Sequence, residues 1–246
     1  MDRPIVRITG GVGSVSRNVF GVFALLLVFG MAMGILEAVV VVYARELWYP
    51  GNFGFPLAET PREILKAELL REAATLVMLA IVAFLAGRRR LDRFLYFLFT
   101  FGVWDIVYYI GLKGFIGWPP SLLTWDVLFL IPVTWVGPVL APILCSVTMI
   151  VMALILVFCE EKGYAPRIDR LGAVMLFGGA LVVFTAFIYD FAAMLVASGL
   201  SGGDAGFREA AGRYVPESFH WGVFLIGEAL IVGFMIRAVN NARRLL

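Results

Sequence analysis

Apolar residues dominate six stretches of the chain, each long enough to cross a membrane as a helix. A hydrocarbon layer of about 30 Å requires about 20 helical residues, and apolar runs of this length separated by polar turns predict transmembrane helices. The predicted spans cover residues 18–43, 64–86, 93–112, 136–159, 171–197 and 217–238. We therefore expect an all-α, polytopic bundle in which residues 1–246 form a single integral membrane domain.

Composition supports a membrane protein, because 61% of the residues are hydrophobic, only 15% are charged and the mean hydropathy is +0.93. Soluble domains keep about a quarter of their residues charged, so the surface of this chain is expected to face the lipid bilayer. The first apolar run begins at Phe20 and is longer than the roughly 7–15 residues of a signal-peptide core. We expect it to be retained as a signal anchor.

Basic residues gather in the N-terminal tail, in the turns after the second and fourth spans, and at the C-terminus. They are Arg3, Arg7, Arg17, Arg88, Arg89, Arg90, Arg93, Lys162, Arg167, Arg170, Arg237, Arg243 and Arg244. Because short cytoplasmic loops accumulate positive charge, this pattern predicts that both termini are cytoplasmic. Topology explains these residues, so nucleic-acid binding is not expected. The excess of arginine over lysine suggests a GC-rich bacterial source and hence the bacterial inner (cytoplasmic) membrane.

Ionisable residues within the spans are expected to meet in the outer half of the membrane. With a rise of 1.5 Å per residue, the predicted orientation places one group of them at similar depth. This group, the candidate cation, metal or proton site, is Glu37, Glu72, Asp105, Asp190, His220 and Glu228. Additional candidates are Glu68, Arg71, Asp126 and Glu217. A charge at the bilayer centre costs about 2.5 to 17 kcal/mol, which favours a functional interior site over chance placement.

Helical phase indicates that several of these side chains face protein. At 100° per residue, Glu217 and Glu228 lie about 20° apart, with His220 on the same stripe. Gly30 and Gly34 form a GxxxG pair whose face continues to Glu37, so another helix is expected to approach there. Asp190 likewise shares its face with small residues such as Gly179, Ala186, Ala193 and Ala197.

Structural roles are alternatives for four of these residues. Glu68 and Arg71 are spaced to neutralise each other, and Arg71 could equally pair with Glu37 or Asp105. Glu217 could serve as an N-terminal acid of the last helix, and His220 could be hydrogen-bonded for packing alone. The remaining acids still outnumber the available cations, so the excess must be protonated or must bind a cation.

The segment from Gly117 to Pro142 contains five prolines and three tryptophans. Prolines 119, 120 and 132 bracket residues 121–131, which are too few to span a membrane as a helix. We expect a short helical piece here, lying in the interface or re-entering over the outer mouth. Asp126 would either cap this piece or add a carboxylate to the cluster.

A metal ion is one cation that these residues could bind. A single Mn, Fe or Zn ion could be held by carboxylates with His220. The Glu217-x-x-His220 spacing resembles the helix motif of di-iron carboxylate bundles, but its counterpart would be Glu68-x-x-Arg71, and arginine cannot ligate. The two cysteines, Cys145 and Cys159, are about 21 Å apart along one helix and cannot join each other.

Three functions remain open. The first is a protein whose buried carboxylate and histidine cluster binds a cation, proton or divalent metal, for transport or coupling. The second is an intramembrane, metal-dependent enzyme acting on a lipid or quinone. The third is a non-catalytic subunit whose acidic interior pairs with basic residues of membrane partners.

Overall fold

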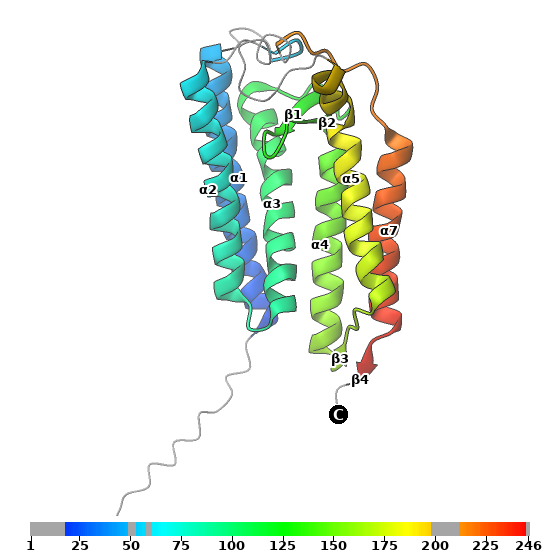
Figure 1. The fold of residues 1–246 in the computed structure, drawn as a ribbon. Coiled ribbons are helices and arrows are strands. Elements are labelled where there is room, and N and C mark those ends of the chain that lie inside the picture. Colours follow the sequence, from blue (N-terminus) through cyan, green and yellow to red (C-terminus); the bar gives the residue numbers. More distant parts are fainter. Residues whose placement is uncertain (1–17, 49–52, 58–60, 198–211, 245–246) are drawn as a thin grey trace, which may run out of the picture.

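The computed structural model describes residues 18–48, 53–57, 61–197 and 212–244 (Figure 1). Within them, six helices are long and apolar enough to cross a membrane. These are α1 (Val19–Trp48), α2 (Arg62–Ala86), α3 (Arg90–Ile116), α4 (Leu140–Glu161), α5 (Arg170–Ala197) and α7 (Trp221–Asn240). The predicted membrane-type helical bundle is confirmed at this level of detail.

The helices form two groups of three, α1–α2–α3 and α4–α5–α7, joined where α3 packs on α4 (Figure 1). Glycines allow the closest crossings. A Cβ on Gly34 of α1 would lie 2.6 Å from the carbonyl oxygen of Trp104 on α3, and one on Gly102 of α3 would lie 2.7 Å from that of Ser146 on α4. The GxxxG pair of the first span is therefore a helix contact, as expected for membrane helices whose backbones approach closely.

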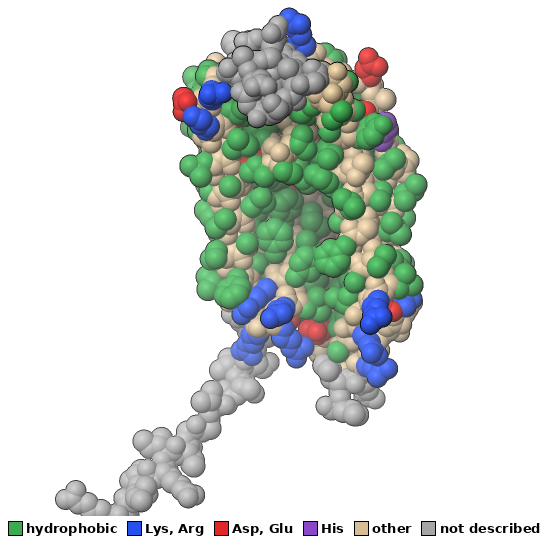
Figure 2. All heavy atoms as spheres, viewed as in Figure 1, with side chains coloured by type: hydrophobic (Ala, Val, Ile, Leu, Met, Phe, Trp, Pro, Cys, Tyr) green, Lys and Arg blue, Asp and Glu red, His purple; other side chains and the backbone are tan. Residues whose placement is uncertain are grey.

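The outer surface of the bundle is apolar over its middle. Figure 2 shows hydrophobic side chains covering this zone, with lysine and arginine gathered at the lower end. Side chains such as Leu25, Phe177 and Val196 are 70–82% exposed. Soluble monomers rarely expose continuous apolar patches of this extent, so the surface fits a lipid environment.

Short polar contacts close the arginine-rich end, which comprises the α2–α3 turn, the α4–α5 connection and the end of α7. Arg237 donates from Nε to the carboxylate of Asp169 at 2.9 and 3.1 Å. This partner holds the pKa of Asp169 well below its usual range. Strand β3 (Tyr164–Ala165) pairs antiparallel with β4 (Arg243–Arg244) at the same end. The tail arginines 3, 7 and 17 lie outside the described residues.

The predicted short helix at residues 121–131 is wrong. Strands β1 (Trp125–Phe129) and β2 (Trp135–Pro138) form an antiparallel hairpin instead. Aromatic and β-branched residues on both arms favour extended backbone, and prolines around them cannot donate helical hydrogen bonds. The hairpin lies near the end opposite the arginines, and its second strand contacts α4 and α5 (Figure 1).

The last transmembrane helix also begins later than predicted. It starts at Trp221, and residues 214–220 are not helical. His220, with ψ 62°, occupies the position before the first helical residue. The helical phase that placed Glu217 and His220 on one stripe with Glu228 therefore does not apply, because Pro216 lies in an irregular segment and 100° steps hold only within a helix.

Candidate functional site

A cavity of about 280 Å³ lies among α1, α2, α3 and the hairpin, in the half of the bundle away from the arginine-rich end. Its ionisable and aromatic lining residues include Glu37, Arg45, Glu68, Arg71, Glu72, Trp104, Asp105, Tyr108, Tyr109, Asp126 and Phe191. Five carboxyl groups thus face two guanidinium groups. The cavity brings together three of the six principal candidate residues and three of the four additional ones.

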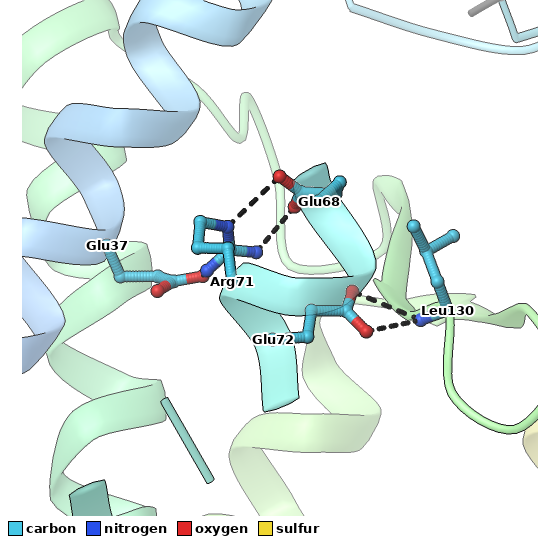
Figure 3. Close-up of polar contacts among 5 residues, drawn as sticks. All are labelled: Glu37, Glu68, Arg71, Glu72 and Leu130. Atoms are coloured by element: carbon cyan, nitrogen blue, oxygen red, sulfur yellow. Dashed lines mark hydrogen bonds and ion pairs between the residues drawn. The ribbon is translucent and has the colours of Figure 1, made fainter. Parts of the chain in front are cut away.

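Arg71 on α2 links two carboxylates from different helices (Figure 3). Its Nε donates to Glu68 at 3.0 Å, one helical turn earlier, and its Nη1 forms an ion pair with Glu37 of α1. Glu37 is placed there because Gly30 and Gly34, on the preceding turns, draw α1 against α3. Of the three partners that the sequence offered to Arg71, Glu68 and Glu37 are therefore contacted together, and Arg71 offsets two acids at once.

Glu72, beside Arg71 in sequence, points instead toward the hairpin (Figure 3). Both of its oxygens accept from the backbone N–H of Leu130, at 3.0 and 3.1 Å. The donor becomes available because Leu130 directly follows β1. Glu72 is 6% exposed, and no ion pair to it occurs among the described residues.

Asp105 lies between the two helix groups. It lies on α3, is 8% exposed, and accepts a hydrogen bond from Ser146 Oγ of α4 at 2.8 Å. Within the described part of the chain no basic side chain pairs with it. Among the described residues, the hydrogen-bond donors to the buried acids Glu72 and Asp105 are thus neutral groups.

Asp126 and Arg45 form a buried pair at the hairpin side of the cavity. Arg45 Nη2 lies 3.3 Å from Asp126 Oδ1, and Tyr109 donates its hydroxyl to Oδ2 at 3.1 Å. The guanidinium carbon sits 4.1 Å from the ring centre of Phe53 and 3.7 Å from that of Trp118. Burial raises the pKa of Asp126 to about 6, although Arg45 and Tyr109 act in the opposite direction. Asp126 therefore adds a carboxyl group to the cluster and caps no helix.

The remaining candidates lie away from this cavity. His220 Nε2 and Asp190 Oδ1 are 3.0 Å apart, both partly exposed, near the hairpin end of α5 and α7. Glu228 is buried between α7 and α4, where Thr148 donates to it at 2.6 Å. Glu217 is exposed. These residues do not line the cavity. The ionisable residues that were expected to form one cluster are therefore divided between the two helix groups.

Metal binding gains no support from this arrangement. Over residues 18–48, 53–57, 61–197 and 212–244, no group of three or more His, Cys, Asp or Glu side chains is placed to hold a metal ion. His220 is paired with one carboxylate, and Glu228 is bound to a threonine.

Sequence reasoning missed Arg45, Tyr109 and Ser146. Arg45 was not predicted as a site residue because the predicted first span ended at residue 43, whereas α1 continues to Trp48. One signal was available, since Arg45 follows Glu37 by eight residues and so falls within about 80° of it around the helix. Ser146 carries no such signal, because its role depends on which helix packs against α3.

Comparisons of the chain with protein-family models, with curated proteins and with solved structures found no match.

Proposed function

We propose that this multi-pass membrane protein is a transporter in which the cavity carboxyl groups exchange protons during the transport cycle. The observation that carries the proposal is the excess of acids over cations in the cavity, with Glu72 and Asp105 held by a backbone N–H and a serine hydroxyl. An unpaired charge within the membrane is costly, so such acids are stable when protonated or when neutralised by a cation.

The height of these acids supports exchange with one side of the membrane. Glu72 lies fourteen residues from the end of α2 at Ala86, and Asp105 lies fifteen residues from the start of α3 at Arg90. At 1.5 Å per residue both stand about 21–23 Å from the arginine-rich end. If that end is cytoplasmic, as its charge predicts, the cavity lies in the outer half of the bacterial inner membrane.

A pH jump on reconstituted protein tests the proposal directly. Proteoliposomes adsorbed on a solid-supported membrane should give a transient current when protons bind to Glu72 and Asp105. We expect Glu72→Gln and Asp105→Asn each to remove a large part of this current. The matched control is Glu63→Gln, which changes an exposed acid in the first turn of the same α2 helix.

Two outcomes would decide the matter. Loss of current in both cavity variants, with the Glu63→Gln current intact, would support proton exchange in the cavity. Equal currents in all four proteins, or no current in any of them while the fold is retained, would show that these acids are structural. The enzyme and subunit hypotheses would then be tested next. A stoichiometric metal would support the enzyme, and a co-purifying membrane partner would support the subunit.

A further inference from the structure

Two buried nitrogen donors beside the cavity lack acceptors. Among the described residues, Nη1 of Arg45 and Nε1 of Trp104 are the buried side-chain polar atoms that make no hydrogen bond. Arg45 is 7% exposed and Trp104 is 5% exposed, and both residues line the cavity. Leaving a buried donor without an acceptor is unfavourable, more so for a charged group, so both residues would be stabilised by an added acceptor.

Glu72 and Asp105 have the opposite need, because they are hydrogen-bond acceptors with few donors. A carboxylate has about four lone-pair positions, and the described partners of these two acids are one backbone N–H and one hydroxyl. Both acids line the same cavity as Arg45 and Trp104. The cavity therefore offers hydrogen-bond donors and, separately, carboxylates that have no cation.

The guanidinium group of Arg45 and the two acids occupy different levels. The head group of Arg45 is held at the level of Tyr109 through Asp126, whereas Trp104 and Asp105 lie four to five residues earlier on α3. The rise of the helix puts these levels about 6–8 Å apart. This separation and a cavity of about 280 Å³ suit a small organic molecule with opposite charges at its two ends.

Aromatic side chains also line the cavity. Trp104, Tyr108, Tyr109 and Phe191 border the cavity. Aromatic faces attract ammonium groups, and desolvation in a closed site strengthens that attraction. The lining thus favours a positively charged nitrogen near Glu72 and Asp105.

We infer that the cavity binds a small zwitterion, with its ammonium group toward Glu72 and Asp105 and its anionic oxygen toward Nη1 of Arg45. This inference rests on the proposed transport function and names the substrate class of the same cavity. The ligand chemistry has two natural sources, a dissolved amino compound or the headgroup of an ethanolamine phospholipid. Both carry a hydrogen-bonding ammonium group and an anionic oxygen a few bonds apart.

Titration of the intact protein with defined probes tests the inference. In nanodiscs of phosphatidylcholine, the probes are glycine, γ-aminobutyrate and O-phosphoethanolamine, with ethylamine and propionate as single-charge fragments. Binding is followed by calorimetry and by thermal stabilisation. We expect at least one zwitterion to bind about tenfold or more tightly than either fragment, because each charged hydrogen bond contributes about 1.5–3 kcal/mol.

Three variants assign the two ends of the ligand. Glu72→Gln should weaken zwitterion binding about tenfold or more, and Trp104→Phe, which removes the indole N–H together with part of the ring, should weaken it a few-fold. Arg45→Lys keeps the charge beside Asp126 but removes the second guanidinium nitrogen, and should weaken anion recognition. Glu63→Gln should bind like the unchanged protein, since Glu63 is exposed and paired with Lys66.

A comparison of two lipids distinguishes a phospholipid headgroup from a dissolved amino compound. Nanodiscs of phosphatidylethanolamine are compared with those of phosphatidylcholine, whose quaternary nitrogen has no N–H to donate. Stabilisation by phosphatidylethanolamine that is lost in Glu72→Gln supports the zwitterion with a lipid as its source. Binding of the dissolved probes in phosphatidylcholine supports a soluble source.

The inference is overturned if ethylamine binds as tightly as every zwitterion, because the Arg45 end would then be unused. It is also overturned if neither the probes nor phosphatidylethanolamine have any effect. The pH-jump current is recorded on the same preparations. A current without zwitterion binding leaves proton exchange standing and removes only the substrate class, whereas binding without a current removes the transport proposal.

Discussion

Adjacent glycines on α5 provide a sharp test of how the second helix group is held together. A Cβ at Gly179 would lie 2.8 Å from the carbonyl oxygen of Gly227 and 2.9 Å from a side-chain carbon of Ile231, both on α7. A Cβ at Gly178, one residue earlier, would meet nothing within 4 Å. The two positions share the same helix and the same sequence context, but only one of them faces α7.

The cost of Gly179→Ala follows from this geometry. Ordinary contact begins at about 3.4 Å, so α5 and α7 must separate by about 0.6 Å or more, and backbone atoms cannot rotate away. Overpacking of this kind costs about 1–3 kcal/mol. Replacing glycine by alanine within a helix also gains up to about 1 kcal/mol, and this gain is common to both positions. The difference in unfolding free energy between Gly178→Ala and Gly179→Ala therefore isolates the packing cost, about 1–3 kcal/mol.

Thermal unfolding in mild detergent measures this difference with a dye that fluoresces on reaction with thiols. Cys145 and Cys159 are free thiols, partly buried on α4, so the dye reports unfolding without introduced cysteines. We expect Gly179→Ala to melt on the order of 2–12 °C below Gly178→Ala. Gly227→Ala should behave like Gly179→Ala, while Gly222→Ala, at an open position of α7, should be neutral. Equal melting of Gly178→Ala and Gly179→Ala would refute the close crossing of α5 and α7.

The other predictions concern the charged groups and the topology. Arg71→Met should destabilise the protein by roughly 1–3 kcal/mol, less than the about 3–5 kcal/mol of a fully buried pair, because Glu37 and Glu68 lose a partly buried partner. Lys66→Met, which breaks an exposed pair on the same helix, should change the melting temperature little. The pKa of Asp126 is raised to about 6 from an ordinary value near 4, so its protonated form favours folding at low pH and this contribution is lost as the pH rises through about 6. Asp126→Asn should therefore make the melting temperature less dependent on pH between about pH 4 and 6. The lost dependence corresponds to roughly 3 kcal/mol of unfolding free energy. An unchanged profile would contradict the raised pKa. A reporter that is active only in the cytoplasm should be active when fused after Arg90 and inactive when fused after Pro120, and the reverse pattern would invert the orientation.

Features that depend on local sequence were predictable. Long apolar runs interrupted by Arg88–Arg90 and by the Lys162–Arg170 region predict helices and turns, since helix formation in lipid satisfies the backbone within each segment. The small residues Gly30 and Gly34 predicted a close helix contact because they permit backbone approach whatever the partner. The carboxylates Glu37, Glu72 and Asp105 could be recognised as unusual from their depth alone.

Features that depend on neighbouring helices could not be predicted. The sequence left Glu68, Glu37 and Asp105 as possible partners of Arg71. The packing of α1 beside α2 decided that Arg71 contacts Glu37 as well as Glu68. The irregular backbone at 214–220 removed His220 from the expected helical stripe. Glu228 accepts a hydrogen bond from Thr148 because α7 packs on α4, and Glu228 therefore lies apart from the cavity.

The sequence by itself determined the membrane-type helical bundle, the arginine-rich end and the presence of more buried acids than cations. These follow from hydropathy, charge placement and a fixed rise per residue, which are properties of single segments. Only the tertiary structure decided that residues 125–138 form a hairpin, that Arg45 enters the cavity beside Asp126, and that Asp190 and His220 form a separate pair. A side chain's partner depends on which segments pack together, and that choice is made by contacts between residues far apart in the chain.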